Sequence, residues 1–239
     1  MKWTIKHYFP VKQALAVENL ASSATSWDAL RTGDDDTWQS IPKDRSMWVA
    51  RCQQKPEIAV NAKAIVDLVK REGFYSIISV GVGAAYLEYN IKKLHPALSL
   101  TCSDFTPRSI DRLRDVFLEC DSIEVFDMLK DQWQPRQNAL YLLYRVDTEF
   151  SDEQWKGLFA TMSESNINDV LFVPSVFLGW RFFIKEKLVN LWHRLKGYRI
   201  MFAGYVRTKD TVKTFWISHY HVIAEVPIGA LTGFLLRKN

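Results

Sequence analysis

The chain of 239 residues is long enough to form one large domain or two small ones around a hydrophobic core. Hydrophobic residues make up 48% and charged residues 24%, with 10 Gly and 8 Pro, which excludes the fibrous, low-complexity and disordered classes. The net charge of +4 is too small to indicate a nucleic-acid partner by itself. It is also uneven, because residues 176–239 hold 11 basic and 3 acidic side chains while residues 1–175 hold 20 and 24. An anionic partner is therefore expected to meet the C-terminal quarter.

The cysteines and the apolar runs indicate the cellular compartment of the protein. Cys52, Cys102 and Cys120 are odd in number and far apart, which predicts buried thiols in a reducing compartment rather than a disulfide or zinc framework. The chain begins with charges where a signal peptide has apolar residues, and no run reaches the ~18 apolar residues of a membrane span. These features together predict a cytoplasmic protein.

Strand and helix patterns alternate from about residue 57 onward. Short apolar runs predict strands, and apolar residues at helical spacing predict the helices between them. The expected strands cover residues 74–80, 98–102, 123–126, 139–144 and 170–173, and the expected helices cover 58–73, 87–94, 106–117 and 151–162. Because apolar strands separated by amphipathic helices form parallel sheets covered on both faces, the pattern predicts a doubly wound α/β fold. A helix over 208–218 and an antiparallel hairpin of strands 221–226 and 231–236 complete it.

Two regions depart from this alternation. Residues 1–56 are expected to form an N-terminal extension, with a loop or lid over 21–44, while 57–239 form the main domain. Residues 176–206 read as an insertion with a helix over 177–196, and the sequence leaves open whether its apolar stripe packs on the core or faces the substrate. Aromatic and basic residues in that helix also allow the alternative that it lies on an anionic membrane surface.

The most informative stretch runs from Ser79 to Ala85, Ser-Val-Gly-Val-Gly-Ala-Ala, between a strand and a helix. Glycines there let the backbone approach a ligand, and the following helix start offers free amides. Asp104 lies 21 residues beyond Gly83 at the end of the next strand, where a carboxylate can accept both ribose hydroxyls. Asp127 ends the third strand in the same way. These positions predict a nucleoside pocket, with ordinary tight turns and helix caps as the alternative.

At these residues the chain resembles the class I S-adenosylmethionine-dependent methyltransferases, over residues 58–239 and including the terminal hairpin. The resemblance implies a Rossmann-like, seven-stranded, mostly parallel sheet in the order 3214576. It also implies S-adenosylmethionine as cofactor, with Gly81, Val82 and Gly83 against its methionine part, Asp104 on the ribose and Asp127 at the adenine edge. Phe105 and Met128 would flank the ring or simply pack in the core, and Arg51 would pair with the cofactor carboxylate or lie at the surface.

Two positions depart from the family pattern. Ser79 stands where the family usually has Asp or Glu, and Ala85 replaces the third glycine. They leave three other functions as alternatives. A nicotinamide-dependent oxidoreductase is disfavoured because Tyr86 occupies the position that needs Gly or Ala, and a nucleic-acid methyltransferase because the Asn- or Asp-Pro-Pro-aromatic motif is missing. A non-catalytic binding or scaffold protein is the remaining alternative.

The methyl acceptor is expected beyond the fourth and fifth strands. Asp147 is the first choice of general base and Glu149 the second, with local capping or ion pairing as the alternative. Expected acceptor contacts are Arg145, Tyr205, Arg207 and His193. The basic insertion predicts an anionic acceptor, so we expect O-methylation of a small molecule or a glycan, phosphorylated or linked to a lipid. His219 and His221 alternate like metal ligands, but without a third ligand they are interpreted as structural, and no metal is expected.

Overall fold

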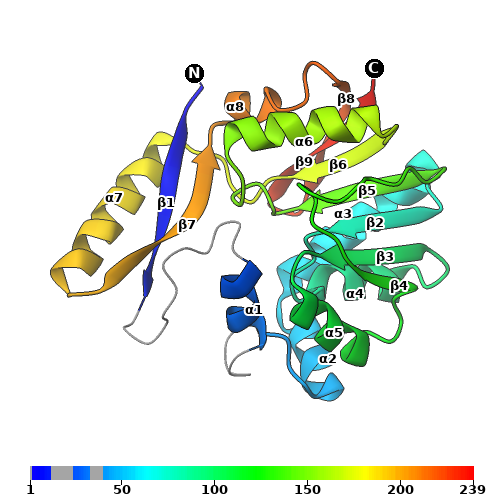
Figure 1. The fold of residues 1–239 in the computed structure, drawn as a ribbon, viewed down its shortest axis with the longest axis horizontal. Helices are drawn as coiled ribbons and strands as arrows, with labels where there is room; N and C mark the ends of the chain where they lie inside the picture. The colour runs from blue at the N-terminus through cyan, green and yellow to red at the C-terminus, as the bar shows by residue number, and fades with distance from the viewer. Residues whose placement is uncertain (1, 12–23, 33–39) are drawn as a thin grey trace.

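The computed structural model describes residues 2–11, 24–32 and 40–239 (Figure 1). Its main sheet has seven strands: β2 (Ser76–Val80), β3 (Ser99–Asp104), β4 (Ser122–Val125), β5 (Ala139–Tyr144), β6 (Asp169–Val173), β8 (Tyr220–Ile228) and β9 (Leu231–Lys238). Their spatial order is β4-β3-β2-β5-β6-β9-β8, and β9 runs antiparallel to both β6 and β8. Counted along this sheet alone, the order is 3-2-1-4-5-7-6, which confirms the predicted topology.

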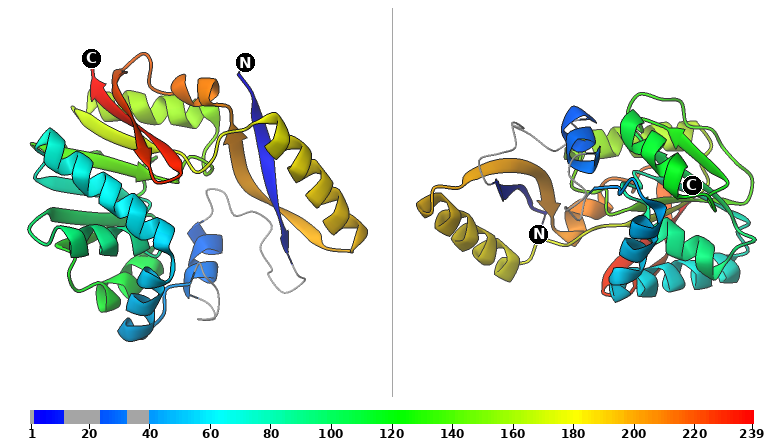
Figure 2. Two further views of the ribbon diagram at one scale, coloured as in Figure 1. Left: turned by 180° about the vertical axis from the view of Figure 1, so that it is seen from behind. Right: turned by 90° about the horizontal axis from the view of Figure 1, so that it is seen from below.

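Helices cover both faces of this sheet (Figure 2). One face packs against α3 (Pro56–Glu72), α4 (Tyr86–Leu94) and α5 (Pro107–Val116), with α2 (Arg45–Gln54) outside them, and the other against α6 (Asp152–Glu164) and α8 (Lys209–Lys213). Successive residues of β5 alternate between the two cores, with Leu142 in the first and Leu143 in the second. The continuous apolar run is therefore explained by burial on both sides.

Local signals set most of the element boundaries. Gly73 ends α3 in the left-handed conformation with φ of +75°. Ser151 and Gln154 form the predicted capping box at the start of α6, with bonds of 3.2 and 2.8 Å. The helix predicted over 208–218 is shorter, since α8 ends at Lys213 and turns follow. The Thr214 hydroxyl donates to the Thr211 carbonyl at 2.7 Å, a local bond that competes with helix continuation.

A smaller unit is attached to the main sheet. In it β1 (Thr4–Val11) pairs antiparallel with β7 (Arg199–Arg207), and α7 (Trp180–Leu195) packs against both strands (Figure 1). Of the alternatives left open for the apolar stripe of this helix, packing on the core is excluded, because its residues are exposed: Trp180, Ile184, Leu188, Leu191 and Leu195. The helix turns its other side inward, where Phe182 and Glu186 contact His7. The N-terminal residues thus belong partly with the predicted insertion.

The predicted loop over 21–44 contains a helix, α1 (Ala24–Thr32), while residues 21–23 and 33–39 lie outside the described residues. Asp28 of α1 accepts hydrogen bonds from the Ser109 amide and hydroxyl at the start of α5. This tertiary contact places α1 beside the edge of the sheet where the site forms. Among the described helices, none combines the length and apolarity needed to cross a bilayer.

Candidate functional site

The glycine turn after β2 has a backbone that needs glycine. Gly81 and Gly83 have φ of +75° and +58°, and the Ser103 carbonyl accepts hydrogen bonds from the Gly81 and Val82 amides at 2.8 and 3.1 Å. A Cβ on Gly81 would lie 2.6 Å from a methyl carbon of Val146. Ala85 keeps the left-handed conformation, with φ of +55°, although it carries a side chain. The turn is thereby bound to the end of β3 and lies close against the loop after β5.

Two adjoining cavities open at this edge of the sheet. The first, of about 200 Å³, is bounded by the glycine turn, Glu88 and Tyr144, and the second, of about 350 Å³, extends past the ends of β3, β4 and β5. Trp27, Arg31, Gly81 and Arg145 line both cavities. Most predicted site residues are brought together here, namely Ser79, Gly81, Val82, Gly83, Asp104, Phe105, Asp127, Met128, Arg145 and Glu149.

Asp104 lines the second cavity, and both of its carboxylate oxygens accept hydrogen bonds. Its Oδ2 accepts from the Gly83 amide at 3.0 Å, and its Oδ1 accepts from the Thr106 hydroxyl at 2.7 Å. The same Oδ1 pairs with Arg31 of α1 at 2.7 Å, and the aspartate side chain is completely buried. The carboxylate is therefore positioned as the sequence predicted, but a guanidinium from the N-terminal segment occupies one of its oxygens.

Asp127 lies at the end of β4 on the wall of the same cavity. Its Oδ1 accepts from the Leu129 amide at 3.0 Å, and its Oδ2 pairs with Lys130 at 2.8 Å, which raises the pKa of that lysine. Phe105 and Met128 add apolar surface to the same cavity. The combination of a carboxylate with aromatic and thioether side chains suits a flat, polar-edged ring.

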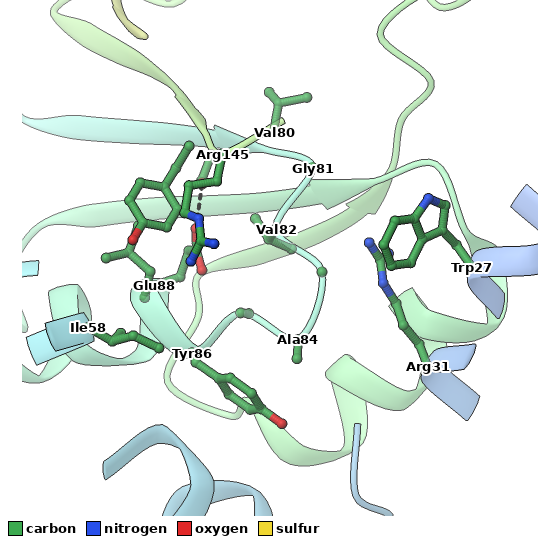
Figure 3. Close-up of a pocket in the computed structure, with 15 residues that line it drawn as sticks. Trp27, Arg31, Ile58, Val80, Gly81, Val82, Ala84, Tyr86, Glu88 and Arg145 are labelled. Atoms are coloured by element: carbon green, nitrogen blue, oxygen red, sulfur yellow. Dashed lines mark hydrogen bonds between the residues drawn. The ribbon is translucent and has the colours of Figure 1, made fainter. Parts of the chain in front are cut away.

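A carboxyl group that sequence reasoning missed lies in the first cavity. The Ser79 hydroxyl donates to Glu88 Oε1 at 2.7 Å, and the Glu88 side chain is 2% exposed (Figure 3). Burial raises the pKa of Glu88 to about 7, against the opposing effect of the Ser79 hydrogen bond. The one signal in the sequence was an acid directly after Leu87, on the buried face of a helix. Its contact with Ser79 depends on how α4 packs on β2.

The α1 helix spans the second cavity through two side chains. Trp27 Nε1 donates to Glu149 Oε2 at 3.1 Å, and the Arg31 guanidinium lies 4.8 Å from the centre of the Trp27 ring. Because Arg31 also pairs with Asp104, the helix links that carboxylate to Glu149. Figure 3 shows Trp27 and Arg31 on one side of the glycine turn, with Glu88 and Arg145 on the other. Neither Trp27 nor Arg31 was predicted, since this segment has no helical periodicity.

The two predicted bases have different surroundings. Asp147 is buried, and its Oδ1 accepts from the amide and hydroxyl of Ser175 at 2.7 and 2.8 Å. Burial raises the pKa of Asp147. It lies outside the residues that line the two cavities, whereas Glu149 lines the second. The geometry thus favours the second choice over the first.

Of the predicted acceptor contacts, Arg145 alone lines the cavities. Arg207 is 1% exposed, and it pairs with Asp152 at 2.5 Å and donates to the carbonyls of Asp147 and Phe150, so its expected role at the acceptor is replaced by a structural one. Tyr205 lies in β7, and its amide donates to the carbonyl of Thr148, in the loop after β5, at 2.9 Å.

Three other predicted residues lie away from the two cavities. His193 lies on α7 between the rings of Trp192 and Tyr198. Arg51 on α2 donates to the Ser40 hydroxyl at 2.9 Å, so the guanidiniums that reach the cavities are those of Arg31 and Arg145. His221 contacts the Asn239 side chain. Within the described residues, no three His, Cys, Asp or Glu side chains are grouped as a metal site would require.

Neither a protein-family model nor a curated protein sequence matches the chain. Solved methyltransferase structures do share its fold. Human N-acetylserotonin methyltransferase, in complex with S-adenosylmethionine, matches with a TM-score of 0.57 and 18% identity over 89% of this chain and 62% of that one. Mitomycin 7-O-methyltransferase matches with a TM-score of 0.59 and 15% identity, over 76% of this chain and 54% of that one. An S-adenosylmethionine-dependent methyltransferase from Leishmania major matches with a TM-score of 0.58 and 10% identity, over 88% of this chain and 83% of that one.

The chain thus spans 62% and 54% of the first two of these proteins. At such identities the comparison shows the architecture, so the chain has the Rossmann-like fold of class I S-adenosylmethionine-dependent methyltransferases. The predicted fold class, with its antiparallel terminal hairpin, is confirmed.

Proposed function

We propose that this protein is an S-adenosylmethionine-dependent methyltransferase. The observation that carries the proposal is the convergence of Gly81, Asp104 and Asp127, from the ends of three neighbouring strands, around two adjoining cavities. In open α/β sheets, ligands bind at the carboxyl ends of strands where the strand order reverses. Here that point lies between β2 and β5, the position of the glycine turn.

The residues of the second cavity fit an adenosine. Asp127 would accept from the adenine amino group, while Phe105 and Met128 would contact the faces of the ring. Asp104 would accept from the ribose hydroxyls. Among the described residues, the Gly83 amide is the one donor to its Oδ2, which leaves a lone pair for a hydroxyl, whereas Oδ1 becomes available only when Arg31 moves away.

The first cavity fits the amino-acid end of the cofactor. Ser79 lacks the carboxyl group that this family usually has at its position, but its hydroxyl holds the carboxyl group of Glu88 beside it. We therefore assign Glu88 to the cofactor ammonium, with Ser79 as the residue that positions it. When bound, the cofactor would supply an electrophilic methyl group on a sulfonium. Gly81 lines both cavities, so the sulfonium, which joins the nucleoside and amino-acid parts of the cofactor, would lie near this residue.

For the acceptor we propose O-methylation of a small molecule or glycan that carries negative charge. Glu149 faces the second cavity and can take the proton of an attacking hydroxyl, and Arg145 offers a cation to an anionic group nearby. Mitomycin 7-O-methyltransferase, one of the structures with the same fold, is by its name an O-methyltransferase. A cytoplasmic location stays a prediction alongside this function; the three cysteines are free thiols.

Calorimetry with S-adenosylmethionine and S-adenosylhomocysteine tests the proposal. We expect both to bind, and Asp104→Ala to abolish binding, because both ribose hydroxyls lose their acceptor. Asp111→Ala on the exposed surface of α5 is the matched control and should bind normally. If the wild-type protein gives no heat with either ligand, the enzymatic proposal fails and a non-catalytic binding or scaffold role takes its place.

A screen for methyl transfer from labelled S-adenosylmethionine addresses the acceptor. Nucleotide sugars, phosphorylated glycans and RNA should be compared, with labelling expected on one of the two sugar classes. Labelling of RNA instead would overturn the choice of acceptor but leave the methyltransferase proposal intact.

A further inference from the structure

The outer face of α7 is apolar and uncovered by any described residue. Trp180, Leu188 and Leu195 are 71%, 61% and 79% exposed, and Ile184 and Leu191 are about half exposed. Figures 1 and 2 both show α7 on the far side of β1 and β7, away from the main sheet. Soluble proteins rarely leave so many large apolar side chains together in water, so this face calls for a partner.

Helix geometry places these residues in one narrow stripe. With about 100° between successive residues, positions 180, 191, 184, 195 and 188 fall in that order within an arc of about 80°. The opposite side of the helix packs on the small sheet, where Glu186 bonds to His7 at 2.8 Å and Phe182 meets the same ring. The stripe therefore points away from the protein along the full length of α7.

Basic residues flank the stripe on both sides. Lys187 lies on one side of the arc, and Arg181 and Lys185 lie on the other. Beyond the last turn, Lys196 Nζ lies 3.9 Å from the centre of the Trp192 ring. Residues 180–199 hold six basic side chains and one acid, Glu186, which is buried on the inner side. The exposed face is thus apolar along its middle and positive along its edges.

We propose that α7 lies flat on an anionic lipid bilayer, with its apolar stripe among the acyl chains and its lysines and arginine at the headgroups. A helix of 16 residues is about 24 Å long, too short to cross a bilayer but suited to lying in the interface plane. Tryptophans at both ends match the amphipathic character of that region. Each basic side chain near an anionic surface adds to the attraction.

A second copy of this chain fits the same face less well. Pairing two α7 stripes would bring the basic edges of one helix against those of the other, and the one acid of the helix is turned inward. Like charges in such an arrangement repel, whereas anionic headgroups neutralise them. The charge pattern therefore favours the bilayer.

The docking surface is connected to the proposed acceptor side. The β7 strand that supports α7 bonds to the loop after β5, where the Thr148 carbonyl accepts from the Tyr205 amide. Docking does not depend on methyl transfer, however, since it rests on the outer face of α7 alone. The two proposals can therefore fail separately.

Flotation of the full chain with vesicles tests the docking surface. We expect binding to vesicles of phosphatidylcholine with phosphatidylglycerol, weak binding to phosphatidylcholine alone, and release by high salt. Leu188→Glu with Leu191→Glu should lower the affinity by at least about tenfold, because two apolar contacts are lost and two negative charges face the headgroups. Tyr75→Glu with Leu118→Glu, at exposed apolar sites elsewhere, is the matched control and should float like wild type.

Three results would overturn the proposal. The first is a wild-type chain that stays unbound with the anionic vesicles, and the second is an α7 variant that floats as well as wild type. The third is a wild-type dimer in sedimentation equilibrium that the two α7 substitutions convert to a monomer, in which case a second copy covers the face. Equal melting temperatures of the two variants and wild type confirm that all three are folded, and binding of S-adenosylhomocysteine without vesicles tests the catalytic proposal independently.

Discussion

The hydroxyl of Ser79 donates a 2.7 Å hydrogen bond to the carboxyl group of Glu88, nine residues later in the chain. The pair spans the glycine turn, because Ser79 lies in β2 and Glu88 lies in the first turn of α4. A carboxyl group is thereby placed next to position 79 without being attached to it. Two predictions rest on this relationship.

Glu88→Gln should separate ligands by their amino-acid part. We expect S-adenosylhomocysteine to bind at least about tenfold more weakly, because a charged hydrogen bond of about 1.5–3 kcal/mol is lost. Methylthioadenosine, which lacks the amino-acid end, should bind as it does to wild type. Calorimetry with both ligands measures this, with Glu57→Gln on the exposed start of α3 as control. An equal loss for the two ligands would mean that Glu88 supports the turn rather than the ammonium.

Glu88 should also make stability depend on pH. Its pKa rises from 4.5 to about 7 on folding, so between these values the folded chain binds more protons than the unfolded chain. The stabilisation is complete below about pH 4.5 and is lost as the pH rises through about 7. The free energy of unfolding falls by about 3 kcal/mol over this range. Urea unfolding of wild type and Glu88→Gln across this range measures the difference. A constant difference between the two proteins would contradict the assignment.

The glycine at position 81 is expected to resist substitution. In Gly81→Ala the new Cβ lies 2.6 Å from Val146, and φ is +75°, so we expect a loss of about 2–4 kcal/mol in unfolding free energy. Gly157→Ala is the matched control, since nothing lies within 4 Å of its Cβ in the middle of α6. That variant should gain up to about 1 kcal/mol. Chemical denaturation of both variants checks the contrast, and equal stabilities would contradict the crowding at the turn.

The burial of Arg207 predicts a structural phenotype. Arg207→Ala removes the partner of Asp152 and of two carbonyl groups, and should cost about 3–5 kcal/mol. Arg237→Ala removes an exposed pair with Asp169 and should cost less than about 1 kcal/mol. Thermal melts of the two variants distinguish them. An Arg207→Ala protein as stable as wild type would restore the earlier interpretation of this residue as an acceptor contact.

Local sequence signals were sufficient for most of the main sheet. The strand predicted over 139–144 is β5 to the residue, because burial on both faces leaves an uninterrupted apolar run. Gly73 and the Ser151 capping box fixed helix ends through short-range bonds alone. The cavity residues at strand ends followed from topology, since parallel strands bring their carboxyl ends to one edge.

The missed features all depend on tertiary contacts. The α1 helix has no periodicity, and its place is set by pairs with residues more than 70 positions away, such as Arg31 with Asp104. The orientation of α7 could not be predicted, because periodicity identifies an apolar stripe but not whether water, protein or lipid covers it. In the same way, the burial of Asp147 and Arg207 depends on a tertiary contact, because the loop after β5 packs against β7.

The pairing of β1 with β7 has a consequence for biosynthesis. Thr4 pairs with Arg207, so β1 leaves the ribosome and waits for a partner that is translated about 200 residues later. At bacterial or eukaryotic elongation rates of about 5–20 residues per second, that delay is on the order of 10–40 s. During this interval the nascent chain carries an unpaired strand, and the small unit that holds α7 can be completed only after β7 has been translated.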